Sequence, residues 1–82
     1  MTSVPAPRVL VVDDEPDIVA LVVYHLARAG YRVSSAATGP DAVAVARRER
    51  PALVVLDLML PGMSGFEVLE AIRADATTQD VA

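Results

Sequence analysis

The chain has 82 residues, a net charge of −4 and a hydrophobic content of 54%. This composition is too apolar for a disordered segment, and the length fits one domain or part of one. All seven basic residues are arginines without a clustered basic face, which argues against nucleic-acid binding by this segment itself. The absence of cysteine excludes a disulfide framework and a thiolate metal site.

The N-terminal residues show no targeting signal. Residues 1–7 lack the charged region and long apolar run of a secretory signal, and we expect them to form a flexible tail. No apolar run approaches the ~20 residues that a membrane helix needs. We therefore expect a cytoplasmic protein that binds no membrane and has its folded part in residues 8–82.

Three short segments rich in β-branched residues predict strands. They are RVLVV at residues 8–12, YRVSSA at residues 31–36 and ALVVLD at residues 52–57. The first and third are continuous apolar runs, as expected for parallel strands covered on both faces. The second is more polar, which favours an edge strand.

Helix signals separate and follow these strands. The first helix is expected to begin near Asp14–Pro16 and to end at Gly30, a left-handed cap. The second and third begin with capping patterns at Thr38 and Ser64. The apolar residues expected to face the sheet are Ile18, Leu21, Val22 and Leu26 in the first helix, Val43, Val45 and Ala46 in the second, and Phe66, Leu69 and Ile72 in the third.

The alternation of strands and helices predicts an α/β domain with parallel strands and right-handed crossovers. Three strand–helix units are present, and Val81-Ala82 stands where a fourth strand would begin. One side of the strand at residues 52–57 would then lack a partner, and such an edge promotes association or domain swapping. We expect the chain to be either a shortened domain or part of a longer one.

Three carboxylates stand at the predicted strand ends. Asp13 and Asp14 follow the first strand, and Asp57 closes the third. If these strands are neighbours, the carboxylates share one site, because ligands of open α/β sheets bind at the carboxyl ends of the strands. An all-oxygen cluster with room for water favours Mg²⁺. Taken singly, the Asp13-Asp14 pair could be an acidic helix start, and Asp57 a strand-end cap.

A metal site leaves the reaction open, and Asp57 is a candidate nucleophile toward phosphorus. Attack by a carboxylate would form an aspartyl phosphate. The two remaining carboxylates would hold a cation that neutralises the charge of the phosphoryl group.

The segments VLVVDDEPDI and LVVLDLMLPGMSGFEVL, at this separation, resemble the receiver domain of two-component response regulators. The resemblance covers nearly the whole chain from Arg8 onward. It implies a flavodoxin-like fold, in which five parallel strands take the order 2-1-3-4-5. This chain would have the first three strand–helix units, with strand order 2-1-3, and would lack the fourth and fifth.

The resemblance also implies roles for particular residues. Asp57 matches the phosphoacceptor, which takes a phosphoryl group from a sensor histidine kinase. Asp14 matches the direct Mg²⁺ ligand, Asp13 the ligand that acts through water, and Met59 a position whose backbone carbonyl binds the metal. The full-length protein would be a DNA-binding transcription regulator and not an enzyme in the usual sense.

Two receiver residues have no counterpart here. A Ser or Thr ends the family's fourth strand and a Lys ends its fifth, whereas this chain has no Lys and stops before both positions. Thr77 and Thr78 stand too early to replace the first. We therefore expect the 82 residues alone to be weak in phosphotransfer.

Two alternatives remain at this stage. A phosphohydrolase of the haloacid-dehalogenase type also has a strand-end Asp nucleophile, but it needs a second Asp where this chain has Met59. The other alternative is an interaction module without phosphotransfer, a homodimer or swapped oligomer formed through the open edge at residues 52–57.

Overall fold

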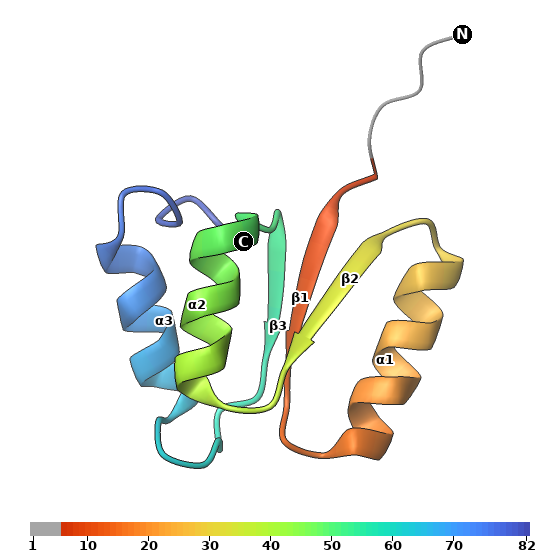
Figure 1. Cartoon of the computed structure of the whole chain (residues 1–82), viewed down its shortest axis with the longest axis horizontal. Helices are drawn as coiled ribbons and strands as arrows, with labels where there is room; N and C mark the ends of the chain where they lie inside the picture. The colour runs from red at the N-terminus through yellow and green to blue at the C-terminus, as the bar shows by residue number, and fades with distance from the viewer. Residues whose placement is uncertain (1–5) are drawn as a thin grey trace, which may run out of the picture.

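The computed structural model describes residues 6–82, and most of the predicted tail lies outside the described residues. All three predicted strands and all three helices are present, and the strands are parallel in the predicted order β2-β1-β3 (Figure 1). In chain order the elements are β1 (Arg8–Val12), α1 (Pro16–Arg28), β2 (Arg32–Ala36), α2 (Gly39–Glu49), β3 (Leu53–Leu56) and α3 (Gly65–Ala74).

The helix ends follow the predicted signals. Thr38 Oγ1 accepts a hydrogen bond from the Asp41 amide at 3.3 Å, and Ser64 Oγ accepts one from the Glu67 amide at 3.2 Å. These bonds satisfy amides that have no partner within the helix. Gly30, just beyond α1, has φ of 100°, a conformation that glycine adopts without steric cost. Local sequence therefore sets where each helix starts or stops.

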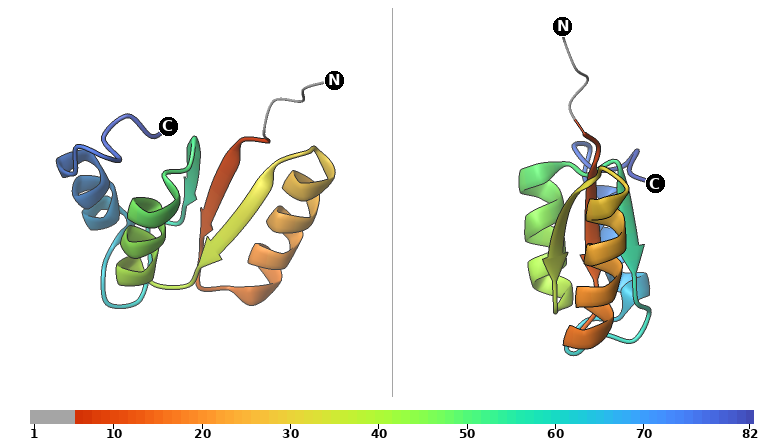
Figure 2. Two further views of the ribbon diagram at one scale, coloured as in Figure 1. Left: turned by 45° about the horizontal axis from the view of Figure 1, so that its top comes forward. Right: turned by 90° about the vertical axis from the view of Figure 1, so that its right-hand side faces the viewer.

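The helices lie on opposite faces of the sheet. The right-hand view of Figure 2 shows α1 in front of the strands and both α2 and α3 behind them. This arrangement follows from right-handed crossovers on either side of the central strand. The main core lies between the sheet and the pair α2 and α3, and its buried residues are Leu10, Val12, Ala36, Ala42, Val43, Ala46, Val68, Ile72 and Val81.

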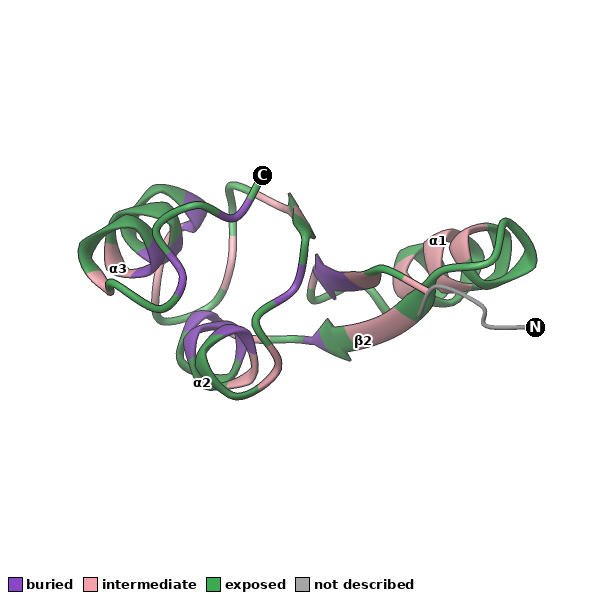
Figure 3. Cartoon of the chain, turned by 90° about the horizontal axis from the view of Figure 1, so that it is seen from above, coloured by how far each residue is buried: buried purple, intermediate pink, exposed green. Residues whose placement is uncertain are grey.

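The prediction that the third strand is covered on both faces is wrong. Leu53 and Val55 are each 40% exposed, whereas Val9 and Val11, their partners in β1, are buried. Leu53 and Val55 point to the face that carries α1, and α1 packs over β2 and β1 instead. Within residues 6–82, no helix covers this face of β3 (Figure 3).

The predicted apolar stripes are also partly wrong. Ile18 and Leu21 in α1, and Phe66 and Leu69 in α3, are exposed. No residue of α1 is fully buried, and the half-buried positions on this helix are Val19, Val22, Val23 and Leu26. In α3 the buried stripe consists of Gly65, Val68 and Ile72. Ile18 lies beside the uncovered face of β3, whereas Leu69 lies beside the opposite face. An apolar pattern does not specify which apolar residues of a helix are covered.

The last residue of the chain, Ala82, is hydrogen-bonded to the outer edge of β3. The Val54 amide donates to the Ala82 carbonyl at 2.8 Å, and the Ala82 amide donates to the Ala52 carbonyl at 3.2 Å. This alternation is that of a parallel ladder. The outer edge of β3 is therefore partly paired at its beginning and unpaired toward its tip among the described residues.

Candidate functional site

The three predicted carboxylates lie together at one end of the sheet. Asp13 and Asp14 follow β1, Asp57 follows β3, and both strands run in the same direction side by side. One carboxylate oxygen from each residue lies within 4.8 Å of the others. The turns that carry these residues lie at the bottom of Figure 1. Parallel pairing therefore produces the cluster that the sequence predicted.

Backbone hydrogen bonds hold Asp13 and Asp57 in place. The Asp57 amide donates to the Val12 carbonyl at 2.9 Å, which continues the ladder between β1 and β3. Each carboxylate then accepts a bond from an amide two residues on: Asp13 from Glu15 at 2.9 Å, and Asp57 from Met59 at 3.1 Å. Such turns fix the side-chain oxygen against the backbone. The orientation of both acids is thus set locally.

The electrostatics of the cluster favour a bound cation. Three negative charges within a few ångströms repel one another unless positive charge lies nearby. The ion pairs of the described residues involve Glu49 and Asp75, which are not part of the cluster. A divalent cation among the three carboxylates would replace this repulsion with attraction.

The donor set fits a hard divalent ion. The cluster offers carboxylate oxygens without sulfur or imidazole nitrogen, which suits Mg²⁺ or Ca²⁺. Asp14 is exposed and the other two acids are half-buried, so water can complete the coordination shell. Few protein ligands together with water are typical of Mg²⁺, whereas Ca²⁺ usually takes a fuller protein cage.

Met59 lies beside the acids through its backbone. Its amide bonds to Asp57, while its side chain points to solvent and the residue is 85% exposed. A role for its carbonyl, and not for its thioether, remains a prediction that this placement permits.

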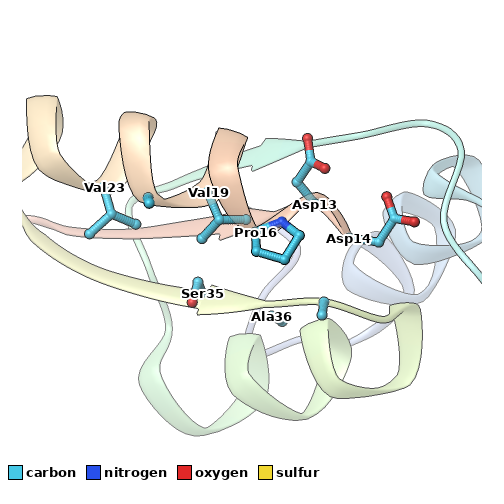
Figure 4. Close-up of a pocket in the computed structure, with 9 residues that line it drawn as sticks. Asp13, Asp14, Pro16, Val19, Val23, Ser35 and Ala36 are labelled. Carbon is cyan, nitrogen blue, oxygen red and sulfur yellow. The ribbon is translucent and has the colours of Figure 1, made fainter.

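Two grooves adjoin the carboxylates. A cavity of about 380 Å³ between α1 and β2 opens beside Asp13 and Asp14, with Val19 and Val23 along its helical wall (Figure 4). A second, of about 320 Å³, runs between α1 and β3 and reaches Asp57. Both grooves are lined mainly by apolar side chains. The carboxylates are therefore charged groups at the edge of otherwise apolar grooves.

Sequence reasoning missed why Gly65 is needed. A Cβ atom at Gly65 would lie 2.5 Å from the Asp57 carbonyl oxygen and 2.6 Å from the Leu58 Cα atom. The start of α3 is therefore packed directly on the backbone that carries Asp57. The sequence offers one signal for this contact, the presence of glycine at position 65.

The comparisons with known proteins identify the family. The family model described as response regulator receiver domain matches residues 9–82. The chain belongs to the receiver domain family. This assignment supports the resemblance noted from the two motifs and replaces the phosphohydrolase alternative.

Individual receivers match along most of the chain. The probable transcriptional regulatory protein TcrX of Mycobacterium tuberculosis is 49% identical over 82% of this chain and 29% of its own length. The N-terminal domain of a response regulator receiver protein from Methanoculleus marisnigri is 41% identical with a TM-score of 0.87, and the match covers 92% of this chain and 61% of that one. The receiver domain of a sensor histidine kinase from Pseudomonas aeruginosa, with a magnesium ion coordinated in its active site cleft, is 32% identical with a TM-score of 0.88. That match covers 93% of this chain and 62% of the solved one.

These matches support the fold class and define its extent. The three parallel strands correspond to the first part of the flavodoxin-like receiver fold. The chain spans less than a third of TcrX and about three fifths of the two solved receivers. Among the described residues, no helix is long and apolar enough to cross a membrane.

Proposed function

We propose that this receiver accepts a phosphoryl group on Asp57 with the help of Mg²⁺. The observation that carries the proposal is the convergence of oxygens from Asp13, Asp14 and Asp57 within 4.8 Å at the strand ends. The magnesium ion in the cleft of the related Pseudomonas receiver supports the choice of metal. The donor would be the phosphohistidine of a sensor histidine kinase.

The chemistry at Asp57 is a substitution at phosphorus. A carboxylate oxygen attacks the phosphorus atom of the phosphohistidine, the P–N bond breaks, and its electron pair returns to the imidazole nitrogen. The product is an acyl phosphate on Asp57. The bond from the Met59 amide to one Asp57 oxygen orients the carboxylate and leaves the other oxygen free to attack.

Asp13, Asp14 and the Met59 carbonyl are the proposed metal-binding groups of this site. As the receiver resemblance implies, Asp14 would bind the ion directly and Asp13 would act through a water molecule. Asp14 is exposed, and Asp13 accepts a hydrogen bond from the Glu15 amide. A divalent ion held by these groups would supply positive charge beside the phosphoryl oxygens.

The phosphoryl group would add a charge of about −1.5 to −2 at neutral pH, which is enough to shift a two-state surface. The relationship to TcrX supports a full-length protein that regulates transcription, with residues 8–82 as the N-terminal portion of its receiver domain. The 82 residues lack the family's switch Ser or Thr and its Lys, so we expect them to be phosphorylated slowly.

Labelling with acetyl phosphate and intact-mass detection tests this proposal. The 82-residue chain should gain one phosphoryl group in the presence of Mg²⁺, more slowly than a complete receiver, and should lose this reaction with excess EDTA. Asp57→Asn should abolish it, because an amide is not a nucleophile toward phosphorus. Asp14→Asn should weaken Mg²⁺ binding by about 10-fold or more. Equal labelling of wild-type and Asp57→Asn would contradict the assignment.

The exposed apolar surface supports a second candidate role, self-association. Ile18 and Leu21 in α1, and Leu53 and Val55 in β3, are all exposed, and Ile18 and Val55 line the groove between these two elements. Toward its tip the neighbouring edge of β3 has no strand partner in residues 6–82. Two copies that join at this surface would bury the apolar side chains and pair the strand edges.

Light scattering coupled to size-exclusion chromatography distinguishes this role. The wild-type chain should elute as a dimer or larger species at high concentration, and Val55→Lys should make it monomeric. Glu70→Lys, a charge change on the exposed surface of α3, is the matched control and should leave the assembly intact. A folded wild-type monomer at all concentrations would contradict the dimer.

A further inference from the structure

The junction between β2 and α2, residues 36–39, contacts both halves of the acidic cluster. Ala36 ends β2, and its carbonyl accepts a hydrogen bond from the Asp13 amide at 3.1 Å. Three residues later, Gly39 is buried at the start of α2 and packs against Met63, in the loop that follows Asp57. One short segment therefore touches the loop of Asp13 and the loop of Asp57.

The contact between Gly39 and Met63 leaves no room for a side chain on the glycine. A Cβ atom at Gly39 would lie 2.4 Å from Met63 Cβ and 2.8 Å from both Cγ and Sδ. The φ angle of Gly39 is not positive, so space and not backbone conformation requires glycine here. A side chain cannot move its own Cβ by rotation, so relief of this clash requires a backbone to move, either that of the Met63 loop or that of the start of α2.

Hydrogen bonds restrain the loop that contains Met63. The Gly65 amide donates to the Leu58 carbonyl at 3.0 Å and closes the loop at its base, close to Asp57. Within it, the Met59 amide is bound to the Asp57 carboxylate at 3.1 Å. In Figure 1 the loop passes beside the first turn of α2. Met63 therefore belongs to the same closed loop as Met59, whose amide binds Asp57, so a displacement at Met63 would act on the loop that holds this carboxylate.

We propose that the Gly39–Met63 contact is a spacer that sets the distance between the Asp13 loop and the Asp57 loop. Gly39 and Met63 are then positioning residues for the cation site, although neither one reaches the cation. The Thr38 cap supports the spacer, because its bond to the Asp41 amide fixes where α2 begins. This inference rests on the proposed function, since the cation site is what the spacer aligns.

Titration calorimetry of Mg²⁺ binding to the 82-residue chain provides the test. Gly39→Ala should weaken binding by about 10-fold or more, the usual cost of disturbing groups that orient metal ligands. Ala46→Gly, at a buried position two turns further along α2, is the matched control. It destabilises the helix but leaves the junction unchanged, so Mg²⁺ affinity should stay within about two-fold of wild type.

A double-mutant cycle with Met63 makes the test specific. Met63→Gly removes all three clashing atoms, so the addition of Gly39→Ala should then have little further effect on affinity. Met63→Ala keeps the Cβ atom, and in that background Gly39→Ala should still weaken binding. The same loss in the Met63→Gly background, or a loss of stability without a loss of affinity, would overturn the proposal.

Amide NMR spectra without metal separate this inference from the proposed function. If the wild-type chain binds no Mg²⁺, the cation site as proposed is wrong, and the spacer is judged from the spectra alone. Gly39→Ala should shift the Asp13 and Met59 amide resonances, whereas Ala46→Gly should leave both in place. Unshifted resonances in Gly39→Ala would overturn the spacer even if the metal binds.

Discussion

The two faces of the sheet differ in how completely they are covered. Behind the sheet, α2 and α3 enclose a continuous core that includes Leu10, Val68 and Ile72. In front of it, α1 covers β2 and β1, has no buried residue of its own, and leaves Leu53 and Val55 exposed. Stability is therefore expected to reside mainly behind the sheet, while the front retains an apolar surface available for contacts.

The acidic cluster stands at the boundary between these faces. Asp57 follows a strand that is packed behind and open in front, and Asp13 follows the strand that is buried on both sides. The cluster therefore links β1, which is buried on both faces, to β3, which is exposed on one face. Substitutions that affect one face and spare the other test this contrast.

The largest expected difference is between Ile72→Ala and Leu21→Ala. Ile72 is 4% exposed in the core, and its truncation should lower the free energy of unfolding by about 2–5 kcal/mol through lost burial and a cavity. Leu21 is 58% exposed on α1, and its truncation should change this energy by less than about 0.5 kcal/mol. Urea unfolding followed by circular dichroism measures both; equal losses would contradict the contrast between the faces.

A smaller effect is expected at Thr78, the one polar residue buried in the core among those described. Thr78 lies beyond the end of α3, and its hydroxyl donates to the carbonyl of Ile72, within that helix, at 2.7 Å. Thr78→Val should lower the free energy of unfolding by about 1–2 kcal/mol, because the carbonyl loses its donor in a buried setting. Thr77→Val, at the exposed neighbour, is the control and should cost clearly less. If the two variants unfold at the same urea concentration, the buried hydrogen bond has no special role.

The smallest effect concerns pH and the loop behind the sheet. Hydrogen bonds from the hydroxyl and amide of Thr77, together with the nearby Arg47 guanidinium, lower the pKa of Asp75 from its usual 3.8. A lowered folded-state pKa contributes stability that is present above pH 3.8 and is lost as the pH falls through the folded value. The urea midpoint should therefore decline less below that pH in Asp75→Asn than in wild type. Parallel pH profiles for the two proteins would contradict the prediction.

Local signals in the sequence were sufficient for the elements and for the acids. Pro16, Thr38, Ser64 and Gly30 mark helix ends by chemistry that acts within a few residues. The cluster of acids required one further inference, that the first and third strands are neighbours. Parallel strand ends then bring the carboxylates together, so the geometry followed from topology.

The contacts between distant segments were not predictable in the same way. Leu53 and Val55 belong to an apolar run, which predicts core residues, yet both are exposed. An apolar run shows that residues are hydrophobic, but it does not show whether a helix covers them. The approach of Gly39 to Met63 joins two loops whose residues show no pairing signal in the sequence. The sequence around Thr78 predicts a loop. The burial of Thr78 depends on how the segment after α3 folds back onto that helix.

The two hydrogen bonds of Ala82 have a consequence for local opening. They protect the Val54 amide, but the register that pairs Val12 with Leu56 turns the Leu56 amide toward the same outer edge, beyond the reach of Ala82. Hydrogen exchange should therefore be slow at Val54 and fast at Leu56, so that β3 frays from the tip that carries Asp57. An ion that bridges Asp57 to the acids after β1 would hold this end of β3 against β1. Ion binding would therefore reduce the local opening of β3 and slow hydrogen exchange at Leu56.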